Sequence, residues 1–253
     1  MKKTLFILVL ALPIMFAKCS KDNEQSNLIL LKVSEKTLYH GDEYQIEASS
    51  NSEITYSSEN KYHAIVSENG LITAMFVGET NILLSNGEDS KTFKVIVTPK
   101  YNLYPEPDVK FGDTKSSIIS KFGTPYSVTE TELGPALSYL NYSNTALMLI
   151  FLFDESDKMI AYDIVVASSF SSVLIDFLSE RYSNIREQDG VHTFINGLTL
   201  NSATVVIDLS LYNSLYWQVI YTPNSLAEST SLKSSKSSIK MNEFDEILNQ
   251  LQK

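Results

Sequence analysis

The chain has 253 residues, 43% of them hydrophobic, one cysteine and a formal net charge of −10. The length is comfortable for two domains, and the hydrophobic content provides a core of ordinary size. The acidic balance opposes nucleic-acid binding and electrostatic docking on anionic lipid, and a single cysteine excludes an internal disulfide.

The stretch 1–24 is typical of a secretory signal. A basic start, Met1–Lys3, precedes the apolar run Leu5–Ala17, and Cys19 follows where processing is expected. At about 1.5 Å per residue, the run falls short of the roughly 30 Å bilayer core, so we do not expect a spanning helix. The stretch resembles a bacterial lipoprotein signal, which implies a signal peptide over 1–18 and lipidation of Cys19. Lys18 departs from the small residue usual before that cysteine.

The polar run Ser20–Glu24 resembles the segment after the cysteine in Bacteroidetes lipoproteins. That resemblance implies an outer-membrane protein displayed on the cell surface and held by a lipid anchor. In the absence of lipidation, Cys19 would be a chance residue of the leader, a free thiol or an intermolecular bridge.

After a tether over 19–27, residues 28–99 alternate short apolar runs with turn signals. Tyr44, Ile46 and Ala48 have the period of a half-buried strand, and Asn69-Gly70 predicts a hairpin turn. Several short strands at this spacing predict an all-β sandwich.

This region resembles the bacterial immunoglobulin-like domain, group 2, of invasin- and intimin-type surface proteins. The resemblance is carried by Tyr39–Asp42, Tyr56–Asn60, Ala64–Ala74 and Val77–Ile82. It implies an immunoglobulin-like sandwich that serves as a spacer or adhesion module, and it supplies no catalytic residues.

Residues 100–108 form a proline-containing linker, and the pattern changes after it. A helix capped by Asp113 or Thr114 and a second helix after Ser169 are each followed by strand-like runs. Because Ser116–Phe122 and Ser171–Phe177 share an apolar pattern, we expect 109–223 to be an α+β domain of two helix-plus-antiparallel-sheet repeats. Together with Gly112, Phe122–Pro125 and Leu137–Tyr142, that order resembles the tandem units of beta-lactamase inhibitor protein and related lipoproteins, although the second half lacks the Gly-x-Pro element. The resemblance implies protein binding through the concave face of the sheet.

Residues 224–253 form a Ser- and Lys-rich tail that ends in a short amphipathic helix over 241–252. The apolar stripe of this helix consists of Phe244, Ile247, Leu248 and Leu251. Docking on the second domain is the favoured role, with self-association and a frayed end as alternatives.

The sequence contains no pattern that predicts catalysis. His40, His63 and His192 lack metal-ligand spacing, and no nucleophile elbow or phosphate loop occurs. The best acidic cluster is Asp154, Glu155 and Asp157, but it lacks the EF-hand spacing and is typical of a hairpin turn. We therefore predict a non-enzyme with no cofactor and no metal.

Aromatic residues suggest a binding role instead. Tyr212, Tyr216 and Trp217 are the candidate contact residues, since tyrosine and tryptophan dominate interface anchors. Strand alternation places Tyr216 and Trp217 on opposite faces, so at least one of them belongs to a core. The predicted function is non-catalytic binding or adhesion to an unknown protein or glycan, without nucleic acid. The alternatives are an envelope-assembly or inhibitory lipoprotein that binds through its C-terminal sheet, and an uncharacterised hydrolase.

Overall fold

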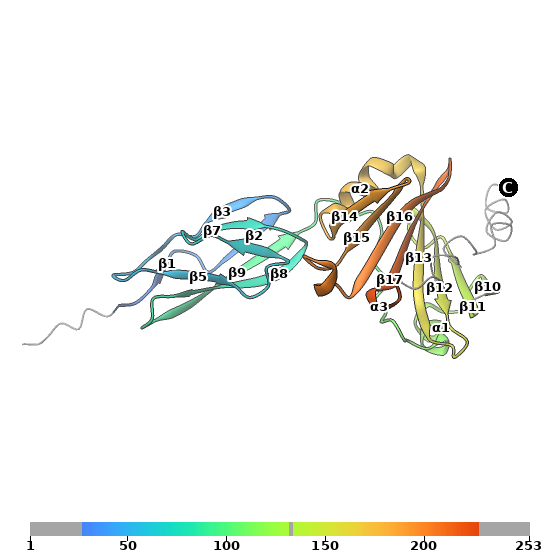
Figure 1. Ribbon diagram of the computed structural model, residues 1–253, viewed down its shortest axis with the longest axis horizontal. Helices are drawn as coiled ribbons and strands as arrows, with labels where there is room; N and C mark the ends of the chain where they lie inside the picture. The colour runs from blue at the N-terminus through green and yellow to red at the C-terminus, as the bar shows by residue number, and fades with distance from the viewer. Residues whose placement is uncertain (1–26, 132–133, 228–253) are drawn as a thin grey trace, which may run out of the picture.

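The computed structural model describes residues 27–131 and 134–227. The molecule is elongated, with a β-sandwich at one end and a larger sheet unit at the other (Figure 1). The predicted leader, the lipidation site Cys19 and the C-terminal helix over 241–252 lie outside the described residues.

The sandwich contains nine strands. These are β1 (Leu30–Leu31), β2 (Glu35–Tyr39), β3 (Glu43–Gln45), β4 (Ala48–Ser49), β5 (Thr55–Ser58), β6 (Ala64–Val66), β7 (Leu71–Ala74), β8 (Gly78–Ser85) and β9 (Ser90–Thr98). One sheet has the order β2-β9-β8-β5 and another the order β3-β7-β6, while β1 pairs with β4. β2 pairs with β9 in parallel, and the other pairs are antiparallel.

A single apolar cluster fills the sandwich. Ile72, Ile82, Leu84, Phe93 and Val95 have no solvent exposure and come from strands of both main sheets. The alternation of apolar and polar residues along β8 and β9 directs every second side chain into this core.

The hairpin expected at Asn69-Gly70 joins β6 to β7. Gly70 adopts a φ of +79°, a left-handed conformation that glycine adopts at no steric cost. A Cβ at this position would lie 2.8 Å from Tyr56 Cζ, so the turn also needs glycine for the close approach of that ring.

The second unit is built on one continuous antiparallel sheet. Its strands are β10 (Ser127–Thr131), β11 (Gly134–Leu140), β12 (Ala146–Phe153), β13 (Met159–Ala167), β14 (Ser183–Gln188), β15 (Val191–Ile195), β16 (Val205–Asn213) and β17 (Tyr216–Pro223). They lie in the order β10-β11-β12-β13-β17-β16-β15-β14. The helical segments are α1 (Lys115–Phe122), α2 (Ser171–Ser179), α3 (Asn224–Ala227) and the 3₁₀ turns Ser168–Phe170 and Leu200–Ser202.

The predicted α+β domain of two helix-plus-antiparallel-sheet repeats over 109–223 is therefore wrong. β13 pairs with β17 from Tyr162↔Tyr221 to Ala167↔Tyr216, so the strands after each helix join in one eight-stranded sheet. A single apolar cluster also runs under both helices, from Ile118 of α1 to Phe177 of α2. The helix pattern on which the prediction rested is local and carries no information about this central strand pair.

One face of the sheet is covered by described chain. α1, α2 and part of the preceding segment pack on it around Phe151, Phe194 and Val219. Leu103 and Tyr104, at 6% and 5% exposure, belong to this core, so the region expected to be a linker over 100–108 contributes to the packing of the sheet unit.

Candidate binding surfaces

The junction between the two units is built from hydrogen bonds that one corner of the sandwich donates to backbone carbonyl oxygens of the sheet unit. Val77 N, between β7 and β8, donates to the carbonyl oxygen of Glu180 at 2.9 Å. The Tyr62 hydroxyl donates to the carbonyl oxygen of Arg181 at 2.6 Å and lies 3.3 Å from that of Ile195. Since these acceptors follow α2 or end β15, the corner is attached directly to the sheet unit.

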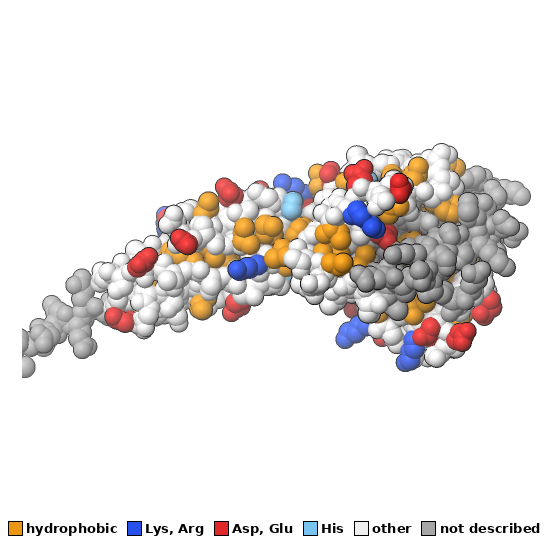
Figure 2. Space-filling view, viewed as in Figure 1, with side chains coloured by type: hydrophobic (Ala, Val, Ile, Leu, Met, Phe, Trp, Pro, Cys, Tyr) orange, Lys and Arg blue, Asp and Glu red, His pale blue; other side chains and the backbone are white. Residues whose placement is uncertain are grey.

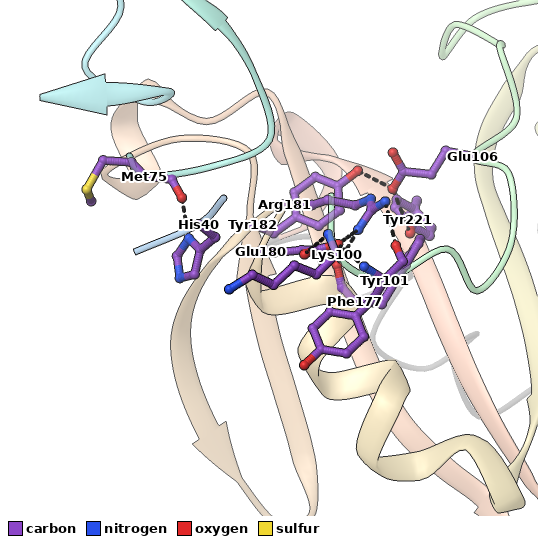
Figure 3. A network of polar contacts seen from close by, with 10 residues as sticks. All are labelled: His40, Met75, Lys100, Tyr101, Glu106, Phe177, Glu180, Arg181, Tyr182 and Tyr221. Carbon is purple, nitrogen blue, oxygen red and sulfur yellow. Dashed lines mark hydrogen bonds and ion pairs between the residues drawn. The ribbon is translucent and has the colours of Figure 1, made fainter. Parts of the chain in front are cut away.

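The side chains of Glu180 and Arg181 hold the chain segment that leaves the sandwich. The Glu180 carboxylate is 3% exposed and accepts from Lys100 N at 2.8 Å and Tyr101 N at 3.1 Å. Arg181 pairs with Glu180 at 2.5 Å, donates to the carbonyl oxygen of Tyr101 at 3.0 Å and lies 3.8 Å from the ring centroid of Phe177 (Figure 3). A buried charge is stable only when it is paired and hydrogen-bonded, so these contacts fix the chain segment after β9 in one conformation.

Stacked rings support the same corner. Phe76 stacks on Tyr62 with centroids 4.6 Å apart and on His40 at 5.7 Å. His63 Nδ1 lies 3.1 Å from the carbonyl oxygen of Phe76, and its ring occupies the space that a Cβ at Gly78 would need. The segment that carries Val77 is thus fixed on both sides.

A cleft of about 500 Å³ lies beside the junction. It is lined by Glu59, Asn60, Lys61, Tyr62, His63, Asn196, Gly197, Leu198 and Ser202. In the space-filling view, hydrophobic side chains gather on both sides of the narrow region where the units meet (Figure 2). The cleft offers hydrogen-bonding groups from both units and is the first candidate binding surface.

A carboxylate and several tyrosine hydroxyls meet at the other side of the same segment. Glu106 Oε1 accepts from the Tyr182 hydroxyl at 2.5 Å and from the Tyr221 hydroxyl at 3.2 Å. The Tyr104 hydroxyl lies 3.1 Å from that of Tyr221, and the ring of Tyr162 stacks on Tyr221 at 4.4 Å. Burial raises the pKa of Tyr221 and Tyr182 well above the ordinary value, so both stay neutral donors to Glu106.

The second candidate surface is the sheet face opposite to α1 and α2, called here the open face. Its apolar half is a cluster formed entirely by strand residues of β11, β12, β13, β16 and β17. The members are Ala136, Leu140, Leu147, Met148, Ile150, Leu152, Ile160, Ala161, Val165, Tyr212 and Tyr216.

One buried acid lies within the open face. Asp163 has no solvent exposure, its Oδ2 accepts from Gln218 Nε2 at 2.8 Å, and its Oδ1 has no hydrogen-bond partner. Burial raises the pKa of Asp163 to about 7. Across the sheet, Asp163 is level with Ile150 on one side and Ile220 on the other. Asp163 is therefore a polar side chain between apolar neighbours on the adjacent strands.

The candidate contact residues from the sequence do not share one surface. Tyr212 packs beside Tyr216 on the open face, where Tyr216 is 8% exposed. Trp217 packs on the opposite, helix-covered face, and its Nε1 donates to Ser171 Oγ at 2.8 Å. The alternation of the strand separates Tyr216 from Trp217 as expected.

The acidic cluster of the sequence forms a turn. Asp154 Oδ1 accepts from the backbone N–H of Ser156 and of Lys158, both at 2.9 Å, and Asp157 pairs with Lys115 at 2.6 Å. Within residues 27–131 and 134–227, no group of three His, Cys, Asp or Glu side chains is placed to hold a metal ion. None of the described helices has the length and apolarity needed to cross a lipid bilayer.

Sequence reasoning missed Glu180, Glu106 and Asp163. For Asp163 a signal existed, because it is the one charged residue in the otherwise apolar run Met159–Ala167. Glu180 and Glu106 stand among polar neighbours, and no local pattern distinguishes them.

Comparison with protein-family models and with curated protein sequences found no match. Similar solved structures include domains 1–6 of the surface layer protein SbsC, at 13% identity and a TM-score of 0.24, over 78% of this chain and 21% of that one. Domains 5–6 of the S-layer protein SbsC match at 10% identity and a TM-score of 0.24, over 78% of this chain and 84% of that one. The chain thus spans about a fifth of the length of the larger of these structures.

Both structures come from a surface layer protein. Since their TM-scores are far below 0.5, the function of this chain is argued from its own residues.

Proposed function

We propose that this protein is a lipid-anchored envelope protein whose sandwich, an immunoglobulin-like spacer, carries the sheet unit as a non-catalytic binding module. The observation that supports this proposal most is that the start of the described chain and the sheet unit are attached to opposite ends of the sandwich. Near the chain start, Ile29 N donates to Asp89 Oδ2 at 2.8 Å and Asn27 O accepts from Asn86 Nδ2 at 2.6 Å. These partners lie at the turn between β8 and β9.

The sheet unit is attached at the other end. β9 runs from that turn to Thr98, immediately before Lys100 and the Glu180 carboxylate. At about 3.3 Å per residue, a strand of this length spans roughly 30 Å. An anchor at Cys19 would therefore place the sheet unit at the end away from the membrane, where the cleft is available to a partner.

Fractionation tests the anchor. Cys19→Ala removes the thiol and should release the protein from membranes, whereas Ser20→Ala keeps the cysteine and should stay membrane-bound. Protease treatment of intact cells should then degrade the Ser20→Ala and parent proteins if they face outward. Complete retention of Cys19→Ala in the membrane fraction contradicts the lipid anchor.

A second candidate function is that of an envelope-assembly or inhibitory lipoprotein that binds through its C-terminal sheet. The apolar half of the open face favours it, because a sheet face of this composition needs a covering layer, which a protein partner would provide. This candidate faces the periplasm, so the protein should resist protease in intact cells and be degraded after the outer membrane is opened.

A further inference from the structure

The open face poses a packing problem. Met148 and Val165 have no solvent exposure and Ile150 has 2%, although every member of their cluster lies on a strand. α1 and α2 belong to the cluster on the opposite face. A sheet face with this composition requires a covering layer, because single-layer sheets with a bare apolar face are not stable in water.

We propose that the C-terminal segment 241–252 forms an amphipathic helix that lies on the apolar half of the open face, against Met148 and Val165. Its apolar stripe, described above, supplies the matching surface: Phe244, Leu248 and Leu251 lie on one side of an ideal helix and Asn249 on the other.

The described chain ends at a place from which the segment 241–252 can reach this face. Asn224 N donates to the carbonyl oxygen of Thr204 at 2.9 Å, so α3 begins beside β16 and β17. β17 is the direct neighbour of β13, which carries Val165. The chain therefore leaves the described region next to the apolar half of the open face.

The lengths agree as well. Residues 228–240 span up to about 40 Å when extended, more than the roughly 34 Å width of an eight-stranded sheet. A helix over 241–252 is about 18 Å long, and the five strands of the cluster, from β11 to β16, cover about 19 Å between their outer axes. One short helix thus covers the cluster.

The arrangement has a consequence for recognition. A partner that used the apolar half of the open face would have to displace the helix first, so the helix would compete with it. The cleft at the junction remains accessible in either case.

Cross-linking tests the contact directly. Cys19 is the only cysteine, so the full chain with Cys19→Ala provides a cysteine-free background. In this background, the pair Leu248→Cys and Val165→Cys should form a disulfide within one chain under mild oxidation. The matched pair Asn249→Cys and Val165→Cys points its new thiol away from the sheet and should react many-fold more slowly. Equal rates for the two pairs overturn the proposal.

Two other occupants would be recognised in the same experiment. A disulfide found only between chains would assign the face to a second copy, and no disulfide in either pair would leave it to a different partner. Both results contradict the proposal.

A second measurement does not depend on thiol geometry. Leu248→Asp places a charge on the apolar stripe, while Asn249→Asp places the same charge on the outer side. With the circular-dichroism spectrum unchanged, Leu248→Asp should raise the fluorescence of 1-anilinonaphthalene-8-sulfonate several-fold, and Asn249→Asp should not. Indistinguishable fluorescence in the two variants overturns the proposal.

Discussion

The backbone N–H of Val77 donates to the carbonyl oxygen of Glu180 at 2.9 Å, and this bond joins the sandwich to the sheet unit. The carboxylate of the same Glu180 accepts from the N–H groups of Lys100 and Tyr101. One residue therefore holds both the corner of the sandwich and the chain that leaves it, so the two units have a defined orientation.

Glu180→Ala should destabilise the protein strongly. It leaves the partly buried guanidinium of Arg181 without its carboxylate partner and leaves the N–H groups of Lys100 and Tyr101 without acceptors. We expect a loss of about 3–5 kcal/mol in the free energy of unfolding, measured by urea denaturation. The control Glu187→Ala removes an exposed carboxylate of β14 and should change it by about 0.5 kcal/mol or less. Equal effects would contradict the role given to Glu180.

Tyr62→Phe should weaken the junction and leave the ring stack intact. The hydroxyl donates to the carbonyl oxygen of Arg181 at 2.6 Å, whereas the ring stacks on Phe76. We expect a loss of about 1 kcal/mol in the free energy of unfolding. The control Tyr44→Phe changes a ring that stacks on Phe93 in the core of the sandwich and should not loosen the junction. Limited proteolysis near residue 100 separates the two variants, and equal cleavage would count against the contact.

Asp163→Asn should change how stability depends on pH. The pKa of Asp163 is about 7 in the folded protein and about 3.9 in the unfolded chain. The folded state then binds the proton more tightly, so stability is highest below about pH 4 and falls as pH rises toward about 7. Asn is neutral throughout, so the variant should lose this fall and gain stability at about pH 8, by up to a few kcal/mol.

The control for this prediction is Asp189→Asn. Asp189 is exposed in a turn with a φ of +53°, a conformation that Asn tolerates as well as Asp. Melting temperatures measured from about pH 5 to 8 should show a flattened profile only for Asp163→Asn. A profile unchanged by Asp163→Asn would contradict the raised pKa.

Gly78→Ala should be far more damaging than Gly87→Ala. Both glycines have positive φ values, +140° and +88°. A Cβ at residue 78 would lie only 2.2 Å from Cε1 of His63, whereas nothing lies within 4 Å of one at residue 87. The strain of Gly87→Ala should cost about 1 kcal/mol, and Gly78→Ala should add at least about 2 kcal/mol by displacing His63. Similar melting temperatures for the two variants would contradict the packing described for this corner.

Local patterns predicted those parts of the fold that are determined locally. Asn69-Gly70 forms the predicted hairpin turn between β6 and β7, and Thr114, one of the two predicted caps, caps α1 through its hydroxyl. Strand β14 was missed because Ser183–Gln188 is an exposed edge strand that lacks apolar alternation.

Long-range pairings could not be predicted in the same way. The joining of β13 to β17 brings together residues such as Tyr162 and Tyr221, and nothing in either strand specifies the other as its partner. The junction could not be predicted either, because Val77 and Glu180 contribute backbone groups, which carry no sequence signal. For the candidate surfaces, the aromatic pattern located β17 but gave no information about which of its faces the helices cover.

The orientation of the two units is the central claim, and a distance distribution between spin labels tests it most directly. With Cys19→Ala as background, labels at Glu88→Cys, in the turn before β9, and Gln188→Cys, at the end of β14, report on the far ends of the two units. We predict a single narrow distribution that broadens when Glu180→Ala is added. A distribution that is already broad before that change, or one that Glu180→Ala leaves narrow, would contradict the account.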